Sequence, residues 1–481
     1  MVDMACLLSD EEVQRFIVDG YTTVRADFPT PMHDGIYRKI DEVFEKEGNV
    51  GNNLLPRVPE IRQVFDHPVV RGALTSLLGP EYIMNPHRHG HLNPPGGKGG
   101  GWHKDCYVFD HNIRQPRFHW ILALYYPQDV TEEMGPTAVL PQHQNYDLIS
   151  DADPARTTEK AVPIIGPAGT IALTHFDAWH RACENRSDRK RYMIKFQFTR
   201  MVEPQQPTWN SISCGWSPPQ TDEERPVSLD VWRWLCGTNA PTGPPAANGT
   251  QHREALLQDL RSADEATRLH AAFGLGSTGI EVVPDLLEAL RYQATEAVDH
   301  IEDKTPANAH GTNPTALHAA QALMAVGVAA VPQLVEALED DHWLVRASLV
   351  DVLANLGPQA SAAIPALEEC LGDDHWWVRR GAAEALGRMK AGDSVPLLAE
   401  RLRDEDRRVR RMAALALAQI GRSFDGAVEA LSEVLEDEDR YNRFYAGLAL
   451  RRMDNEAARE VLLDALFTAR WCPVTTPESQ Y

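Results

Sequence analysis

The stretch VPQLVEALEDDHWLVRASLVDVLANLG, residues 331–357, predicts a helical hairpin. Pro332 suits the first turn of a helix, and an apolar helix is expected over 333–338, before an acidic turn. A second helix is expected over 344–356, with Gly357 suited to end it. Because one hairpin cannot bury its apolar stripe alone, several copies must stack on one another.

The same pattern returns along the second half of the chain. An arginine recurs at steps of 33, 31 and 33 residues, and an aspartate precedes each arginine by six residues. The pairs are Asp340 and Arg346, Asp373 and Arg379, Asp404 and Arg410, and Asp437 and Arg443, and prolines keep this step at Pro332, Pro365 and Pro396. Repeats of this length predict a solenoid of roughly five to seven hairpins.

This pattern resembles HEAT-like repeats over residues 251–470, and the resemblance implies an interaction surface and no chemistry. A polar insertion over 293–314 interrupts one of the earlier repeats. The repeated Asp and Arg positions favour a polar ladder between repeats over a binding site. Trp343 and Trp376 occupy equivalent positions, with Trp377 adjoining, and both packing between repeats and a partner-binding stripe remain open. A weaker similarity to the repeats of bilin lyases would imply tetrapyrrole binding.

The first part of the chain differs in composition, because eleven of the 18 histidines precede residue 181. A capping-box spacing at Ser9 and Glu12 predicts a helix that ends at Asp19-Gly20. Short alternating or apolar runs bounded by Gly and Pro then predict strands over 21–24, 82–92, 120–126, 137–140, 170–174 and 192–198. These elements indicate an antiparallel sandwich or barrel with helices in front.

The boundary between the two parts has linker composition. We expect a domain over 1–235, a linker over 236–250, a repeat domain over 251–470 and a tail over 471–481. The formal net charge is -22 and both halves are acidic, which argues against duplex nucleic acid or anionic membrane as the main partner. The seven cysteines are odd in number and lack paired spacing, and no export signal is recognisable, so we expect a cytoplasmic protein. No run of about 18 apolar residues occurs, so we expect no membrane spans.

A triplet of the form His-x-Asp, combined with a distant histidine, can place two imidazoles and one carboxylate on one side of Fe(II). By chance alone, about two to three His-x-acid triplets are expected in this chain, so the triplet needs context. His103-Lys104-Asp105 follows a glycine-rich loop over 94–101, where a strand would turn both side chains to one face. His175-Phe176-Asp177 is a rival pair.

The distant ligand set supports the first triplet. A strand over 170–174 leads to His180, which is followed by Asn185, Ser187 and Arg191. This arrangement resembles the phytanoyl-CoA dioxygenase family of Fe(II) and 2-oxoglutarate oxygenases over about residues 7–200. The other matching pieces are the opening helix and strand, Trp120, the turn Met134-Gly135-Pro136-Thr137 and the segment Pro141-Gln142-His143. The resemblance implies a double-stranded β-helix, also called a cupin-like jelly-roll, with flanking helices.

The resemblance also implies roles for particular residues. His103, Asp105 and His180 are expected to bind Fe(II) and to be catalytic. Arg191 is expected to hold the distal carboxylate of 2-oxoglutarate by two hydrogen bonds, and Trp120 and Thr137 are expected to line that cosubstrate pocket. Alternation also puts His87, His89 and His91 on one strand face, where they would line the substrate pocket, support the ligands or simply be polar residues of the sheet.

The expected reaction uses O2 and 2-oxoglutarate to hydroxylate an unactivated C–H bond of a small molecule and releases succinate. Asp105 argues against halogenation, because halogenating members of the family have Ala or Gly at that position. The repeats would recruit a protein partner or mediate self-association. The alternative is an interaction or scaffold protein in which the repeats are the working part and the dioxygenase-like domain is catalytically silent.

Overall fold

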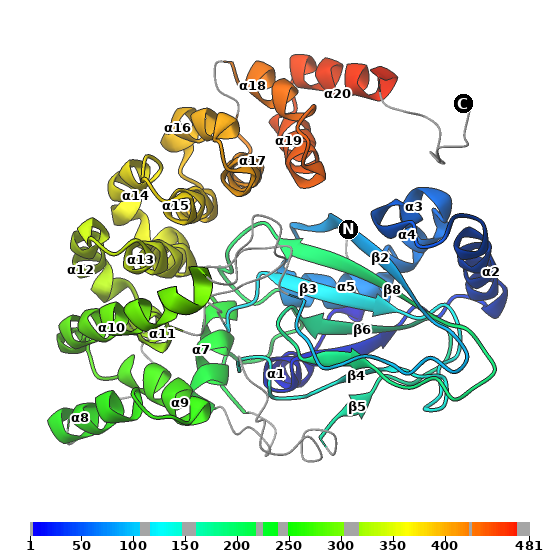
Figure 1. Ribbon diagram of the computed structural model, residues 1–481, viewed down its shortest axis with the longest axis horizontal. Coiled ribbons are helices and arrows are strands. Elements are labelled where there is room, and N and C mark those ends of the chain that lie inside the picture. Colours follow the sequence, from blue (N-terminus) through cyan, green and yellow to red (C-terminus); the bar gives the residue numbers. More distant parts are fainter. Residues whose placement is uncertain are drawn as a thin grey trace. The chain divides into compact units, whose positions relative to one another are not determined.

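The computed structural model describes residues 3–105, 116–146, 160–217, 225–238, 249–302, 317–422 and 426–468. They form two compact units that divide between residues 238 and 249 (Figure 1). Most of the predicted linker and all of the predicted tail lie outside the described residues. The first unit contains every described strand, and the second is entirely helical in its regular elements.

The first α-helix of the first unit begins with the predicted capping box. Ser9 accepts a hydrogen bond from the backbone N–H of Glu12, whose side chain returns to Ser9, and Gly20 ends the helix at a φ of 72°. The α-helices are α1 (Asp10–Asp19), α2 (Thr30–Glu47), α3 (Leu54–Arg57), α4 (Glu60–Phe65), α5 (Pro68–Leu78) and α7 (Arg225–Leu235), with short 3-10 helices at Met4–Cys6 and Gly51–Asn53. The predicted opening helix is therefore confirmed.

Two antiparallel sheets make up the strands of this unit. The strands are β1 (Tyr21–Arg25), β2 (Tyr82–Asn93), β3 (Trp120–Tyr125), β4 (Thr137–Val139), β5 (Val162–Pro163), β6 (Thr170–His175), β7 (His180–Ala182) and β8 (Arg191–Arg200). One sheet has the order β1-β6-β3-β8-β2, and the other has the order β5-β4-β7. The expected antiparallel strands are confirmed, but the pairings among the described residues do not by themselves close a jelly-roll barrel.

The larger sheet has one face covered by helices and one face left for a site. Side chains alternate across a strand, so Ile121, Ile194 and Phe196 point to the helices, where Phe65 stacks on Phe196 with ring centroids 4.8 Å apart. The alternate positions of β8, among them Arg191 and Lys195, therefore point to the opposite face. Polar side chains buried on that face are the first structural indication of a functional site.

The second unit consists of stacked helical hairpins, as the repeat predicts (Figure 1). Its α-helices are α8 (Gly249–Asp259), α9 (Glu265–Leu275), α10 (Val283–Glu302), α11 (His318–Val326), α12 (Val331–Glu336), α13 (Trp343–Leu356), α14 (Ile364–Cys370), α15 (Trp376–Arg388), α16 (Val395–Glu400), α17 (Arg407–Ile420), α18 (Ala427–Val434), α19 (Arg440–Met453) and α20 (Glu456–Thr468). Short 3-10 helices join several of them, at Ile280–Val282, Gly327–Ala330, Ala337–Glu339, Gly357–Ala363, Gly392–Ser394 and Arg401–Arg403. Pro332 lies in the first turn of α12 and Gly357 caps α13.

The repeated arginines and aspartates form the predicted polar ladder. The Nε atoms of Arg346, Arg379 and Arg410 lie 2.7, 2.8 and 2.7 Å from carboxylate oxygens of the next repeat, on Asp373, Asp404 and Asp437. Each arginine also donates through Nη1 to the backbone carbonyl of the aspartate in its own repeat. One side chain thus ties the turn of its own repeat to the next repeat.

The Arg379 rung supplies a stability prediction. Both partners are buried, with 8% of Arg379 and 4% of Asp404 exposed, so Arg379→Ala leaves the Asp404 carboxylate with only the more distant Arg401, at 3.9 Å. We expect the variant to lose about 3 kcal/mol of unfolding free energy in urea denaturation of the full chain. Arg403→Ala is the control, because Arg403 and Glu433 are both more than half exposed, and it should lose less than about 1 kcal/mol. Equal losses would contradict the ladder's role.

The tryptophans of the repeats pack on one another and on the N-cap histidine between them. The Trp343 ring stacks on His375 at 3.8 Å, and Trp376 and Trp377 stack at 4.9 Å. Trp343 also lies 5.8 Å from Trp377. These contacts join neighbouring repeats, so the packing interpretation accounts for the aromatic residues.

One helical segment is apolar on average over a membrane-spanning length, although it is not an unbroken apolar run. His318–Glu339 is long and apolar enough to cross a membrane by length and composition alone, although 61% of its apolar window is buried within the protein. All nine residues of α11 are buried, and α11 packs against α9, α10 and α13. A single segment of this kind is weak evidence for a membrane span, because a core helix of stacked hairpins has the same composition.

Candidate metal centre

His103 and His180 are brought together by the backbone. His180 begins β7, and His103 lies outside the named strands but forms an isolated antiparallel bridge with it, in which each backbone N–H donates to the other's carbonyl at 3.0 Å. The expected strand through His103 and Asp105 is therefore wrong. The side chains of His103 and Asp105 still lie on the same side of the backbone. Lys104, between them, points elsewhere and donates from Nζ to the carbonyl of Gln144.

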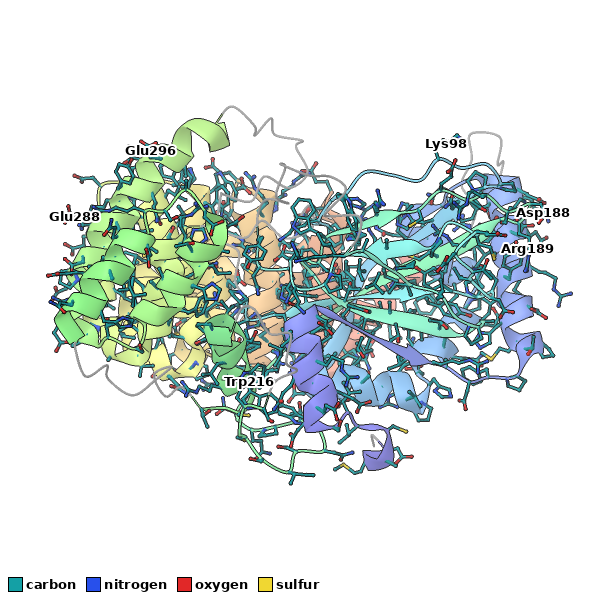
Figure 2. The ribbon with its side chains drawn as sticks, turned by 90° about the horizontal axis from the view of Figure 1, so that it is seen from below. Lys98, Asp188, Arg189, Trp216, Glu288 and Glu296 are labelled. Atoms are coloured by element: carbon teal, nitrogen blue, oxygen red, sulfur yellow. The ribbon has the colours of Figure 1, made fainter. Side chains whose placement is uncertain are left out.

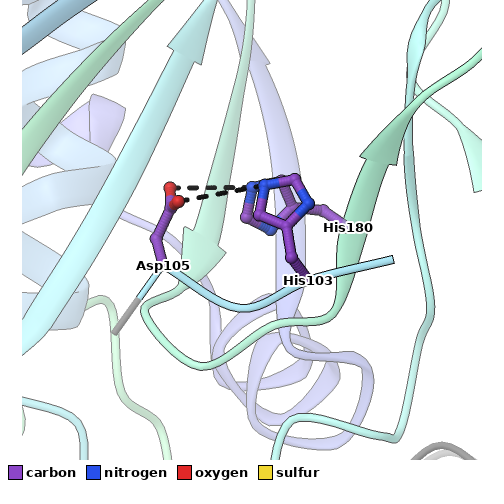
Figure 3. A group of neighbouring side chains, drawn as sticks. All are labelled: His103, Asp105 and His180. Carbon is purple, nitrogen blue, oxygen red and sulfur yellow. Dashed lines mark ion pairs between the residues drawn. The ribbon is translucent and has the colours of Figure 1, made fainter. Parts of the chain in front are cut away.

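The three predicted ligands converge. One donor atom from each of His103, Asp105 and His180 lies within 4.8 Å of the other two (Figure 3). The Nε2 atom of His103 is 3.9 Å from Asp105 Oδ1, and the Nε2 atom of His180 is 3.6 Å from Asp105 Oδ2. Asp105 and His180 are buried, whereas 53% of the His103 side chain is exposed. The cluster therefore has a buried side and an open side.

Backbone contacts orient both imidazoles. The Nδ1 atom of His103 lies 3.0 Å from the carbonyl of Gly101, and the Nδ1 atom of His180 lies 3.0 Å from the carbonyl of Ala178. A carbonyl can only accept, so each Nδ1 carries the proton and each Nε2 keeps a lone pair directed at the cluster. This is the tautomer that a metal-binding imidazole requires.

Electrostatics keep these donors in the ligating form. Burial lowers the pKa of His180 to about 4, although Asp105 opposes the shift, so its imidazole is neutral at neutral pH. Burial alone would raise the pKa of the Asp105 carboxyl, but Lys195 and His180 hold it below its usual range. The Lys195 ammonium is itself buried and donates to Asp105 Oδ2 at 2.5 Å. That contact leaves Asp105 Oδ1 on the side of His103.

Arg191 lies at the start of β8, on the same strand face as Lys195. It is 1% exposed, and it donates through Nε and Nη2 to the carbonyl of Gly135 at 2.9 and 2.6 Å. Among the described residues, the groups whose charge acts on Arg191 are Tyr126 and Cys183, and neither is a carboxylate. Burial lowers the pKa of its guanidinium, against the influence of Tyr126 and Cys183. A buried cation without a carboxylate partner suits an anionic ligand.

The motifs around Arg191 build the turn that holds it. Gly135 has a φ of 65°, and a Cβ there would lie 2.3 Å from the Asn93 amide nitrogen and 2.7 Å from the Cys183 carbonyl, so only glycine fits. Asn185 donates to the carbonyls of Asn93 and Arg189, and accepts from Ser187. The Asn and Ser of the sequence motif therefore shape the entry into β8.

Thr137 and Trp120 lie at different ends of the site face. Thr137 is 2% exposed and adjoins Tyr126, which is buried next to Arg191. Trp120 pairs in register with Thr199, eight residues along β8 from Arg191, a separation of about 26 Å in an extended strand. The structure thus brings Thr137, but not Trp120, to the Arg191 end.

The other histidines in the described part of the chain do not join this cluster. His175 accepts through Nδ1 from the backbone N–H of Asp177, so the rival pair is engaged in a local turn. His89 and His91 pair with Lys195 and Met193, which places them on the site face, and their ring centroids lie 4.7 Å apart with the rings tilted by 44°. A bulge between Met84 and Arg88 separates His87 from this alternation.

The glycine-rich loop is tied to the strand of the distal histidine. The backbone N–H groups of Gly96 and Gly100 donate to the carbonyls of Asn185 and Ala182. Lys98, labelled in Figure 2, forms an exposed ion pair with Glu184 at 2.9 Å. These contacts describe a connection that is held in place, and they support the loop as a structural link.

Two residues of the site escaped sequence analysis, Lys195 and Tyr126. The signal for Lys195 was a basic residue at an even offset from Arg191, flanked by Ile194 and Phe196 in the strand. A separate cavity of about 690 Å³ lies among α8 to α11, where Glu288 and Glu296 form part of its lining (Figure 2). It belongs to the helical unit and contains none of the predicted ligands.

The family comparison decides what kind of domain carries this cluster. Residues 6–193 match the family model of phytanoyl-CoA dioxygenase. Residues 6–193 form a phytanoyl-CoA dioxygenase domain. The match is to a family of dioxygenase enzymes and lies in the first part of the chain, whereas the HEAT-repeat model matches residues 310–387, 364–425 and 395–471 of the helical unit. No curated protein sequence matches the chain.

Several solved structures are similar to part of the chain. The non-heme alpha-ketoglutarate-dependent carbocyclase SnoK from nogalamycin biosynthesis is 19% identical with a TM-score of 0.35, over 45% of this chain and 94% of that chain. The epimerase SnoN, in complex with Fe3+, alpha ketoglutarate and nogalamycin RO, is 16% identical with a TM-score of 0.34, over 40% and 83%. The non-heme monooxygenase ThoJ in its Ni complex is 16% identical with a TM-score of 0.32, over 46% and 94%.

Proposed function

We propose that the chain is an Fe(II)- and 2-oxoglutarate-dependent oxygenase that hydroxylates a C–H bond of a small molecule and forms succinate. The observation that carries this proposal is the cluster of His103, Asp105 and His180, with both imidazole Nε2 atoms directed at one carboxylate. The phytanoyl-CoA dioxygenase domain supports the same chemistry.

The donor set fits a divalent iron. Two neutral imidazoles and one ionised carboxylate are the ligands that non-haem Fe(II) uses on one side of its coordination sphere. Because the His103 side chain is half exposed, the cluster is accessible from the side on which His103 lies. Bound there, Fe(II) supplies the oxidising chemistry that converts O2, 2-oxoglutarate and a C–H bond into succinate, CO2 and an alcohol.

The protein's own residues hold the reactants. Arg191 would bind the distal carboxylate of 2-oxoglutarate, because its buried guanidinium has N–H donors beyond the two that the Gly135 carbonyl accepts. Thr137 and Tyr126 adjoin that end and would supply hydroxyl groups. Lys195 holds one oxygen of Asp105, which fixes the carboxylate's orientation.

A binding and turnover experiment tests the proposal. Anaerobic calorimetric titration of the full chain with Fe(II), and then with 2-oxoglutarate, should show one site for each. Admission of O2 should then yield succinate at a rate that depends on all three components. A chain that binds neither ligand and forms no succinate would instead support the scaffold alternative.

The helical unit has a separate proposed role. HEAT repeats suggest interaction with a protein, so we propose that the solenoid recruits a partner or a second copy of the chain. Size-exclusion chromatography with light scattering at several concentrations separates these two outcomes. A cytoplasmic location remains a prediction from composition.

A further inference from the structure

Gln197 on β8 is a buried amide without a partner. Gln197 is 0% exposed, and neither Oε1 nor Nε2 of its side chain forms a hydrogen bond. Burial of an amide without partners is unfavourable by an amount that proteins rarely tolerate outside functional sites. Because both polar atoms of one side chain lack a partner, Gln197 is a candidate to bind a ligand.

The neighbouring strands do not satisfy this amide. On one side Gln197 pairs with Leu122, which is apolar. On the other side β2 bulges, because Met84 pairs with Phe198 and Arg88 with Phe196, so three residues of β2 face Gln197. The side-chain amide of Asn85, in the bulge, already has other partners. It donates to Thr199 Oγ1 at 3.4 Å and accepts from the backbone N–H of His87 at 3.1 Å.

The position along β8 places Gln197 on the far side of the metal cluster from Arg191. Alternate residues share a face, so Arg191, Lys195 and Gln197 point the same way. Lys195 contacts Asp105, and Gln197 follows two residues later, about 7 Å further along the strand and away from Arg191. A 2-oxoglutarate anchored at Arg191 would therefore leave the Gln197 end to a different molecule.

We propose that Gln197 recognises the substrate of the oxygenase by binding an uncharged group that donates and accepts hydrogen bonds side by side, as a carboxamide does. This inference rests on the proposed function. A carboxamide offers an acceptor to Nε2 and a donor to Oε1, so it satisfies both atoms at once. A carboxylate would meet Oε1 with a second acceptor, and an ammonium would meet Nε2 with a second donor. Trp120, at the same end of the sheet, adds an aromatic surface.

The first test measures stability and needs no substrate. Gln197→Met keeps the length of the side chain and removes an unpartnered amide, so the melting temperature of the full chain should rise by about 2 to 4 °C. Gln128→Met is the matched control. Gln128 is 4% exposed, and its amide is fully engaged, donating to the Tyr192 carbonyl at 2.9 Å and accepting from its N–H at 3.2 Å. This control should melt lower than the wild type.

The second test measures substrate-dependent succinate formation. The probes are sets of small carboxamides, each with the carboxylic acid and the amine of the same carbon skeleton. Carboxamides should stimulate 2-oxoglutarate turnover most in the wild type, and Gln197→Met should lower that kcat/KM at least tenfold. The affinity for Fe(II) and the KM for 2-oxoglutarate should stay unchanged.

The outcomes separate this inference from the proposed function. If Gln197→Met melts lower, as Gln128→Met does, the amide is structural and the inference is overturned. Stimulation by acids or amines in preference to amides, or by no amide at all, overturns it as well. A wild type that binds neither Fe(II) nor 2-oxoglutarate refutes the proposed function, whatever the melting temperatures are.

Discussion

His180→Ala is expected to abolish succinate formation by the full chain. Loss of a partner that merely orients a metal ligand reduces metal affinity by about 10- to 100-fold, so loss of a ligand should reduce Fe(II) affinity at least ~100-fold. Anaerobic calorimetry with Fe(II) measures this effect directly. His180 is buried against Asp105, so circular dichroism must accompany the titration to show that the variant is folded.

The control for this prediction is His252→Ala. His252 is exposed on α8 in the helical unit and belongs to no cluster, so the variant should bind Fe(II) as the wild type does. Asp105→Ala should reproduce the defect of His180→Ala, because both residues contribute to one cluster. Retention of full Fe(II) affinity by a folded His180→Ala variant would refute the assignment of the site.

Arg191→Met is expected to raise the KM for 2-oxoglutarate by about 100-fold, because loss of one partner of a buried charge pair weakens binding by roughly 2–5 kcal/mol. Fe(II) affinity should change little, since Arg191 contacts Gly135 and none of the three predicted metal ligands. Arg191→Lys should give an intermediate KM, because lysine keeps the charge but not the pair of parallel donors. Initial rates of succinate formation against 2-oxoglutarate concentration provide the measurement.

Arg189→Met serves as the matched control for charge alone. Arg189 lies two residues earlier and is exposed, as Figure 2 shows, so its loss should leave the KM within about twofold of the wild type. If both arginine variants raise the KM equally, the effect is a general loss of positive charge. Only a specific effect at Arg191 supports a carboxylate anchor.

The regular elements could be predicted because local sequence determines them. The cap at Ser9, the proline in the first turn of α12 and the glycine after α13 specify helix ends through contacts within a few residues. The repeat step likewise predicted the ladder between Arg346 and Asp373, since each hairpin presents the same face to the next.

The sequence by itself determined the residue types of the candidate site and the longer strands of the first unit, but not the short strands β5 and β7. Only the tertiary structure decided that one bridge joins His103 to His180, that Lys195 reaches Asp105, and that Trp120 lies at the opposite end of β8 from Arg191. The physical reason is sequence separation: these contacts join segments that are tens of residues apart, and strand register fixes which side chains meet. Spacing along the chain indicates which residues are candidates for the site, whereas the pairing of strands determines where each of them lies.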